Sequence, residues 1–457
     1  MKKIIWQLLT MTLLGAFILS ACAPAAVATD MPKATDVPAV APKATDVPAV
    51  APKATDVPAV SAEKLKTNVV HYYSGELGKK DMTSIITDFN AQSKTCEIID
   101  NTTGHEDFKT QVLVMLAGEN PPDVFSYWAG ARVQFVVDSK ALMELSDFWK
   151  AQKLDSVITK GIQGSTQYSG GVYSIPQNFH YVGFFYNPKA FAKAGITETP
   201  KTWDEFLAVA DKLKAAGISP IALGSKNRWP AQFYMDFLVS YTAGHEYRAK
   251  LQKGEASFTD PEVMKAMELW KGLIDKGYFY PDANAYDWTD AADQVSKGTA
   301  GMTLMGTWIT GYWDGTGLKA GVDYDVFPFP IIDAKIPPAT FASTDSWVIP
   351  AQAKNPQCAK DFIAWALTPE MQLLWAKGQG ALPASSLVDT SSFNPVMKKA
   401  LNYISTGTMW LPAYDLSTTP PNAEIGLNFF AQMMNDPSKY ATYLEDAQKQ
   451  SAEVFKK

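Results

Sequence analysis

Short apolar runs alternate with amphipathic segments along most of the chain after residue 68. Residues 68–73 are predicted to form a buried strand, and the segment that follows, to about residue 93, a helix. Strand-like runs at 97–100 and 123–125 flank a segment, 107–118, whose apolar residues recur at helical spacing. This alternation predicts an α/β fold in which ligand-binding loops gather at the carboxyl ends of the strands.

The stretch 170–206 has the clearest local signals. A turn and a buried strand come first, and a second apolar strand follows at 183–186. Asn187 and Pro188 then predict a helix start, because proline suits the first helical position. Thr202 and Glu205 have the spacing of a capping box and predict another helix start. Further elements are expected as a strand at 219–223, a helix from Pro261, a glycine-to-strand segment at 297–308, a strand at 346–350, and helices from Pro356 and Pro369.

The N-terminus has the pattern of a secretory signal peptide. Lys2 and Lys3 precede an apolar run at 4–19 that is too short and too N-terminal for a typical spanning helix. The run ends in Leu-Ser-Ala-Cys at 19–22, which resembles the lipobox of bacterial lipoproteins. That resemblance implies a signal peptide at 1–21 and lipid attachment at Cys22; the alternative is a chance cysteine.

A repeat follows the signal peptide. A decamer of the type APKATDVPAV occurs three times between residues 31 and 60, with one substitution. Two prolines per decamer oppose a helix, and the small residues offer no face to bury. We expect residues 22–65 to be an extended linker; a recognition motif for a partner is the alternative.

Two cysteines remain besides Cys22. Cys358 lies in a predicted helix and Cys96 beside a predicted strand, in a protein that is expected to be exported. These two cysteines could therefore form a disulfide. A hydrophobic core of this size is stable without one. We predict two buried free thiols.

The order of several motifs carries a family resemblance. Tyr-Ser-Ile-Pro and Tyr-Asn-Pro near residue 180 are followed by Pro-x-Thr-Trp-Asp-Glu-Phe, Gly-x-Trp and Leu-Pro-Ala. From about residue 68 to the C-terminus the chain resembles the extracellular solute-binding proteins of bacterial ABC importers, the family that includes maltose and other sugar binders. The resemblance implies a two-lobed periplasmic-binding-protein fold of type II with a ligand cleft between the lobes.

The same resemblance implies lobe boundaries. Lobe 1 is expected at about 66–178 and 340–380, and lobe 2 at about 179–339 and 381–457. The chain should then cross between lobes three times, near 175–181, 329–344 and 378–383.

The amino-acid composition favours some classes of ligand over others. The chain has 41 lysines and arginines and 47 aspartates and glutamates, which gives a net charge of −6. It has no run of basic residues that would indicate nucleic-acid binding. The only arginines are Arg132, Arg228 and Arg248, which mildly favours a neutral ligand over a carboxylate or phosphate. The four histidines are scattered, and no phosphate loop or nucleophile elbow occurs, so no cofactor, metal or catalytic residue is predicted.

A sugar site needs flat aromatic rings for apolar C–H patches, and carboxylates or amides for hydroxyl groups. Several of the thirteen tryptophans lie in loops where the resemblance places the cleft. Of Tyr72 and Tyr73, at most one should reach it, since neighbours in a strand face opposite sides. The predicted ligand-binding residues are Ser74, Glu76, Trp128, Asn178, His180, Tyr181, Trp229, Trp308 and Asp345, with Asp287 and Trp288 a weaker pair.

The function predicted from the sequence is a lipid-anchored, monomeric binding protein. It would capture a mono- or oligosaccharide by cleft closure and deliver it to an ABC permease. Two alternatives stay open: a lipid-anchored glycoside hydrolase, which would use the same aromatic and acidic residues, and a sensor that presents the ligand to a membrane receptor.

Overall fold

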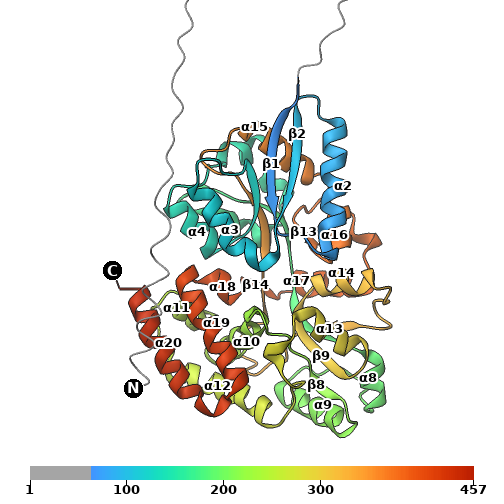
Figure 1. The fold of residues 1–457 in the computed structure, drawn as a ribbon. Helices are drawn as coiled ribbons and strands as arrows, with labels where there is room; N and C mark the ends of the chain where they lie inside the picture. The colour runs from blue at the N-terminus through green and yellow to red at the C-terminus, as the bar shows by residue number, and fades with distance from the viewer. Residues whose placement is uncertain (1–62, 457) are drawn as a thin grey trace, which may run out of the picture. The chain divides into compact units, whose positions relative to one another are not determined.

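The computed structural model describes residues 63–456, apart from the side chains of Glu76 and Leu77 (Figure 1). The predicted signal peptide, Cys22 and nearly all of the predicted linker lie outside the described residues. Within 63–456, no helix has both the length and the apolar character that a membrane crossing requires.

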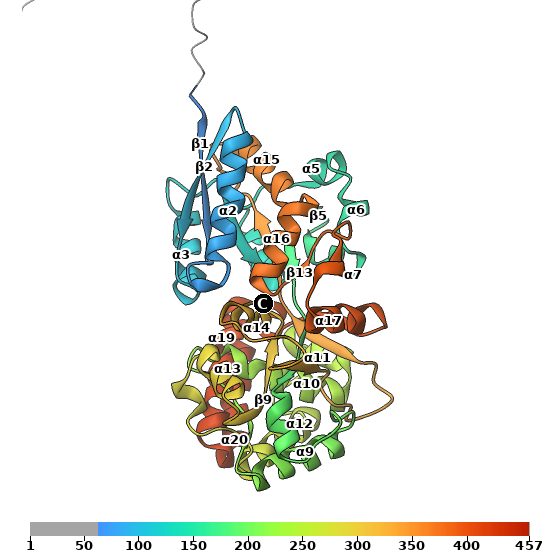
Figure 2. The same cartoon turned by 90° about the vertical axis from the view of Figure 1, so that its right-hand side faces the viewer.

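The first lobe is built on a six-stranded sheet. Its strands lie in the order β13-β6-β12-β3-β1-β2, and β1 pairs in parallel with both β2 and β3, whereas β12 is antiparallel to β3 and β6. Helices α2, α15 and α16 lie together beside this sheet (Figure 2). The strands are β1 (Leu65–His71), β2 (Cys96–Thr102), β3 (Val124–Trp128), β6 (Ile175–Phe179), β12 (Thr344–Val348) and β13 (Leu382–Pro383). The helices of this lobe are α2 (Glu76–Gln92), α3 (His105–Ala117), α4 (Ala131–Asp138), α5 (Ser146–Ala151), α6 (Leu154–Val157), α7 (Lys160–Gln163), α15 (Pro356–Ala366) and α16 (Pro369–Gln379), and β4 (Gln167–Tyr168) and β5 (Gly171–Val172) form a small hairpin.

The second lobe is built on a four-stranded sheet in the order β10-β7-β9-β8. All seven residues of β9 are buried, as expected for a strand covered on both faces. The strands are β7 (Val182–Tyr186), β8 (Ser219–Ile221), β9 (Ala300–Gly306) and β10 (Asp325–Phe327). The helices are α8 (Pro188–Lys193), α9 (Trp203–Ala215), α10 (Gln232–Ala243), α11 (His245–Gln252), α12 (Pro261–Asp275), α13 (Trp288–Ser296), α14 (Trp308–Gly315), α17 (Pro395–Ser405), α18 (Tyr414–Ser417), α19 (Pro420–Asn435) and α20 (Tyr440–Val454). A separate ribbon pairs β11 (Ala339–Ala342) with β14 (Met409–Pro412).

The predicted helix starts of this lobe are confirmed. The Asn187 side chain accepts hydrogen bonds from the backbone N–H groups of Lys189 and Ala190, and Pro188 opens α8. Thr202 and Glu205 form the predicted capping box at the start of α9. These caps satisfy N–H groups that a helix leaves without partners at its start.

Within the described residues the chain passes between the two lobes three times. The first change falls between Phe179, at the end of β6, and Val182, at the start of β7, and the second between β10 and β12. The third comes later than the predicted 378–383. Leu382 pairs with Phe179 in the first sheet, and Ser385 still bridges to Ile158, so this part of the chain lies in lobe 1 and not in lobe 2.

The prediction of two free thiols is wrong. Cys96 and Cys358 form a disulfide, with their Cα atoms 5.7 Å apart. The bond joins the start of β2 to α15 across 262 residues of sequence. Closing so long a loop in the unfolded chain stabilises a fold by about 2–4 kcal/mol in typical cases. The sequence could not show this pairing because the whole sheet of the second lobe, β7 to β10, lies between the two cysteines along the chain.

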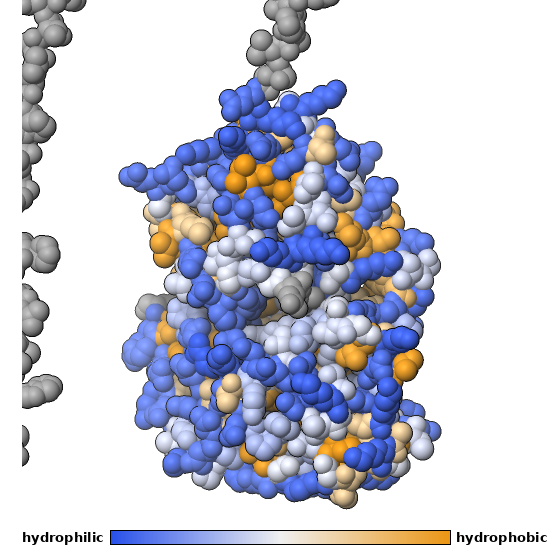
Figure 3. Space-filling view, turned by 45° about the vertical axis from the view of Figure 1, so that its right-hand side comes forward, coloured by the Kyte–Doolittle hydropathy of each residue, from blue (hydrophilic) through white to orange (hydrophobic). Residues whose placement is uncertain are grey.

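The surface of the described part is mainly polar. On the face shown in Figure 3, hydrophilic side chains predominate and apolar ones form small separate patches. The large apolar side chains that are exposed come from different elements, among them Val114, Phe135 and Leu387. Scattered exposed apolar residues of this kind are ordinary for a folded domain.

Candidate functional site

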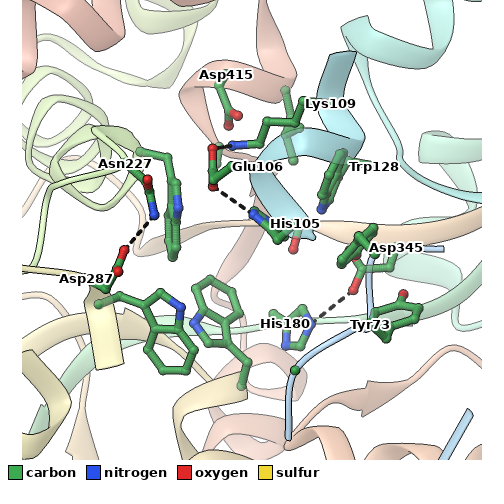
Figure 4. A pocket seen from close by; sticks show the side chains of 18 of the residues that line it. Tyr73, His105, Glu106, Lys109, Trp128, His180, Asn227, Asp287, Asp345 and Asp415 are labelled. Atoms are coloured by element: carbon green, nitrogen blue, oxygen red, sulfur yellow. Dashed lines mark hydrogen bonds and ion pairs between the residues drawn. The ribbon is translucent and has the colours of Figure 1, made fainter. Parts of the chain in front are cut away.

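A cavity of about 420 Å³ is lined by residues from both lobes (Figure 4). The first lobe contributes the residues after β1, the start of α3 and the neighbouring ends of β3 and β12. The second lobe contributes the starts of α10, α13 and α14 together with α18. The lining residues are Tyr72, Tyr73, Ser74, Gly75, His105, Glu106, Lys109, Trp128, His180, Asn227, Trp229, Gln232, Phe233, Asp287, Trp288, Thr289, Trp308, Ser343, Asp345, Gln379, Ala413, Asp415 and Leu416.

Three central strands of the first sheet bring one group of side chains together where β3 and β6 end and β12 begins. Asp345 on β12 is the direct cross-strand neighbour of Trp128 on β3 and of Asn178 on β6. Directly opposed residues of paired strands project to the same face, so these three side chains are held side by side. Tyr72 and Tyr73, which follow β1, complete this wall, and the Tyr72 ring stacks on Trp128 with 4.4 Å between centroids.

A second aromatic wall comes from the other lobe. Trp308 begins α14 and makes edge contacts with Trp229, at 5.8 Å between ring centroids, and with His180, at 4.9 Å. The local sequence Gly-Thr-Trp makes this possible. A Cβ atom at Gly306 would lie 1.9 Å from the Trp308 ring, so only glycine leaves room for the indole beside the end of β9.

Asp345 is the most unusual polar group of the cavity. Its carboxylate is almost completely buried; Oδ2 accepts a hydrogen bond from Asn178 Nδ2 at 2.8 Å and lies 3.3 Å from His180 Nε2. Its other oxygen, Oδ1, forms no hydrogen bond of normal geometry with any described residue. Gln379 Oε1 is a second buried acceptor of the cavity wall without a partner. Buried acceptors left in this way are costly unless a ligand or water donates to them.

The tyrosines beside Asp345 stay neutral. Burial, and after it the charge of Asp345, raise the pKa of both Tyr72 and Tyr73 well above the usual value near 10. Their hydroxyl groups therefore keep their protons at every physiological pH and can donate hydrogen bonds.

The cavity holds no free cation among the described residues. Lys109 is the one lysine or arginine that lines it, and its Nζ pairs with Glu106 at 2.8 Å. Burial alone would raise the pKa of Glu106, but the hydrogen bond with His105 and the charge of Lys109 lower the pKa to about 2. Glu106 is therefore ionised and neutralises Lys109 throughout the physiological range. Arg132 lies behind the wall and pairs with Asp415 at 3.1 Å.

Most of the residues predicted from the sequence line this cavity. The set is Ser74, Trp128, His180, Trp229, Trp308 and Asp345, together with the weaker pair Asp287 and Trp288. Glu76 begins α2 next to Gly75, and its side chain lies outside what the structure describes. The structure therefore brings residues that are more than 270 positions apart in the sequence into the lining of one cavity.

Two predicted residues do not line the cavity. Tyr181 is buried, and its ring stacks on Tyr403 at 5.5 Å between centroids, because the chain turns into β7 at this point. Asn178 is fully buried behind Asp345, where its amide is held by other side chains. The expectation that at most one of Tyr72 and Tyr73 reaches the cleft is also wrong. Strand β1 ends at His71, so the alternation of a strand does not apply to them.

Other lining residues were missed by the sequence analysis. His105, Glu106 and Lys109 form the first turn of α3, directly after the carboxyl end of β2. Such a strand–turn–helix start is a signal that could have identified them. Gln379 and Asp415 gave no signal, because Gln379 reaches the cavity only after the second change between lobes and Asp415 only after the third.

The geometry includes no metal site. Within 63–456 there is no cluster of three or more histidine, cysteine, aspartate or glutamate side chains arranged to hold an ion. The cavity combines large aromatic side chains with polar and charged groups from both lobes, a lining of the kind that binds small molecules.

Comparison with known families decides the class. The family model described as "Bacterial extracellular solute-binding protein" matches residues 75–373. The chain belongs to this family. Extracellular-binding components of this kind work outside the cytoplasm, and the family consists of binding proteins. The predicted two-lobed fold of type II is confirmed by solved structures of the family.

Two curated relatives illustrate the similarity. An uncharacterized ABC transporter extracellular-binding protein of Pyrococcus horikoshii is 31% identical over 347 residues, which is 75% of this chain and 75% of the relative. A probable sugar-binding periplasmic protein of Mesorhizobium japonicum is 28% identical over 296 residues, 64% of this chain and 69% of the relative.

Two solved structures share the fold closely. The bacterial solute receptor AcbH, described as having an exclusive preference for β-D-galactopyranose, superposes with a TM-score of 0.79 at 25% identity, covering 86% of this chain and 99% of AcbH. A chitin oligosaccharide binding protein gives a TM-score of 0.77 at 24% identity, covering 85% of this chain and 98% of that protein.

Proposed function

We propose that this protein captures a neutral sugar in the cavity between its lobes and delivers it to an ABC permease. One observation carries the proposal: two aromatic walls face the buried carboxylate of Asp345, whose Oδ1 forms no hydrogen bond of normal geometry with any described residue. Indole faces suit the C–H patches of a pyranose ring, and a carboxylate oxygen accepts a hydrogen bond from a hydroxyl group.

The charges of the cavity argue against an anionic ligand. Lys109 is already neutralised by Glu106, so a sugar carboxylate or phosphate would find no free cation in the cavity wall. It would instead meet the carboxylate of Asp345 across a buried site, and such like-charge contact is costly. The family relatives that are described as sugar-binding, and AcbH with its galactopyranose preference, point the same way.

Delivery would rest on closure of the lobes around the sugar. Because the cavity takes residues from both lobes, a sugar contacts its full set of partners only when the lobes are together. Binding therefore favours the closed arrangement by its differential affinity for it. A permease that distinguishes closed from open would then accept only the loaded protein.

A panel of neutral and anionic sugars tests this function. We expect galactose or another neutral sugar in a panel at millimolar concentration to raise the thermal unfolding midpoint, while galacturonate and sugar phosphates leave it unchanged. A micromolar ligand at a thousandfold excess stabilises a protein by about 4 kcal/mol. A panel in which only anionic sugars raise the midpoint would refute a neutral-sugar site.

We further propose that Cys22 carries a lipid and that residues 22–65 tether the binding domain to the membrane surface. The basis is the lipobox-like sequence and the proline-containing repeat. Acyl chains anchor a protein without a spanning helix. Cys22→Ser is then expected to move the protein from the membrane fraction to the soluble fraction; retention of the variant in membranes would contradict the anchor.

A further inference from the structure

The residues behind Asp345 form a chain of hydrogen bonds that no ligand needs to touch. Trp375, on α16, donates from Nε1 to Asn178 Oδ1 at 2.7 Å. Asn178 donates from Nδ2 to Asp345 Oδ2 at 2.8 Å. Both Trp375 and Asn178 are buried and lie outside the cavity lining, so the chain runs from the core of lobe 1 to the cavity wall.

We propose that Trp375 and Asn178 are positioning residues that set which oxygen of Asp345 is offered to the sugar. This inference rests on the proposed sugar-binding function. The indole can only donate, so its hydrogen bond fixes the oxygen of the Asn178 amide toward Trp375. The amide nitrogen then faces β12, where it engages Asp345 Oδ2 and lies 3.0 Å from His180 Nε2, and Asp345 Oδ1 is left without a hydrogen bond of normal geometry.

Without the indole N–H, the Asn178 amide loses the one donor that faces its oxygen, while its nitrogen keeps the contacts with Asp345 Oδ2 at 2.8 Å and His180 Nε2 at 3.0 Å, so its orientation is fixed from one side only. A flipped amide would put its oxygen against the Asp345 carboxylate, and two acceptors at that distance repel each other. Asp345 would rotate, and the free acceptor would no longer be presented in one direction.

Trp375 also supports the wall by packing. Its ring meets Tyr73 edge-on at 4.5 Å between centroids, and Tyr73 lines the cavity. Trp375→Phe keeps an aromatic ring for this contact and removes the hydrogen bond, which separates the two roles.

A matched control exists in the same lobe. Trp365 on α15 donates its indole N–H to the backbone oxygen of Ile85, at 3.3 Å and away from the cavity. Trp365→Phe therefore loses an indole hydrogen bond of the same kind without touching Asp345. It reports the effect of such a loss on stability alone.

The test is a double-mutant cycle on affinity for the neutral sugar that the panel identifies. We expect Trp375→Phe to weaken binding about tenfold in the wild-type background, the usual effect of one lost hydrogen bond, and less than about twofold when Asp345→Asn is already present. Trp365→Phe should leave affinity unchanged in both backgrounds. Equal losses in the two backgrounds, or no loss at all, would overturn the positioning role.

A ligand-free readout separates this inference from the proposed function. In a crystal structure of Trp375→Phe without sugar, we expect the Asn178 amide to adopt more than one orientation, so that its hydrogen bond to Asp345 Oδ2 is no longer fully occupied. An unchanged Asn178–Asp345 contact would refute the inference even if sugars bind. If no sugar binds the wild type, the proposed function fails while this structure still decides whether Trp375 orients the amide.

Discussion

Trp308→Ala is expected to weaken sugar binding by at least about 30-fold. Trp308 is half-buried at the start of α14, where it lies among Trp229, Phe233 and His180 in the cavity wall of the second lobe. Central aromatic anchors of this kind cost about 2 kcal/mol or more when they are truncated to alanine. Isothermal titration calorimetry with the identified sugar measures the loss.

The ligand-free protein should change much less. Trp308 makes its ring contacts with residues that also line the cavity or border it, so its removal mainly widens the cavity. Trp203→Ala provides the control. Trp203 is a half-buried tryptophan at the start of α9 that packs against Phe206 and Phe329, away from the cavity. It should lower the unfolding midpoint without altering affinity; a large fall in midpoint for Trp308→Ala with unaltered affinity would make Trp308 a core residue.

Asp345→Asn is expected to weaken sugar binding about 10- to 100-fold. A hydrogen bond to a charged group contributes about 1.5–3 kcal/mol. The amide that replaces the carboxylate has an oxygen at only one of the two positions, so it cannot accept from Asn178 at one position and from a sugar hydroxyl at the other. The substitution keeps the size of the side chain, so calorimetry reports the loss of charge and of one acceptor.

The thermal stability of Asp345→Asn should rise or stay unchanged, although its affinity for the sugar falls. Asp345 is a buried carboxylate with one unpartnered oxygen, and burial of such a charge costs free energy in the ligand-free protein. We expect the unfolding midpoint of Asp345→Asn to equal or exceed that of the wild type. Asp333→Asn, at an exposed turn, is the control and should change neither quantity. Unchanged affinity in Asp345→Asn would remove Asp345 from the site.

Local signals predicted the elements well. The Asn-Pro start of α8 and the Thr-x-x-Glu start of α9 depend on contacts within a few residues, so their sequence determines them directly. Trp308 was predicted from the family resemblance of its Gly-x-Trp segment, and the structure adds the physical reason for Gly306, where a Cβ atom would meet the indole.

Contacts between distant segments escaped prediction. The disulfide between Cys96 and Cys358 and the lobe-1 position of Leu382 depend on where the chain returns to the first lobe after the second sheet, β7 to β10. The role of Asn178 was misjudged because its cross-strand neighbour, Asp345, stands between its amide and the cavity. Which residues are cross-strand neighbours depends on the order of the strands in the sheet. The sequence alone did not determine that order.

The most direct measurement is a crystal structure of the protein with the neutral sugar that gives the largest thermal shift. The account predicts one sugar ring in the cavity between the lobes, with a hydroxyl group within hydrogen-bond distance of Asp345 Oδ1 and a ring face against Trp308 or Trp128. Sugar density elsewhere on the protein, with this cavity holding only water, would contradict it.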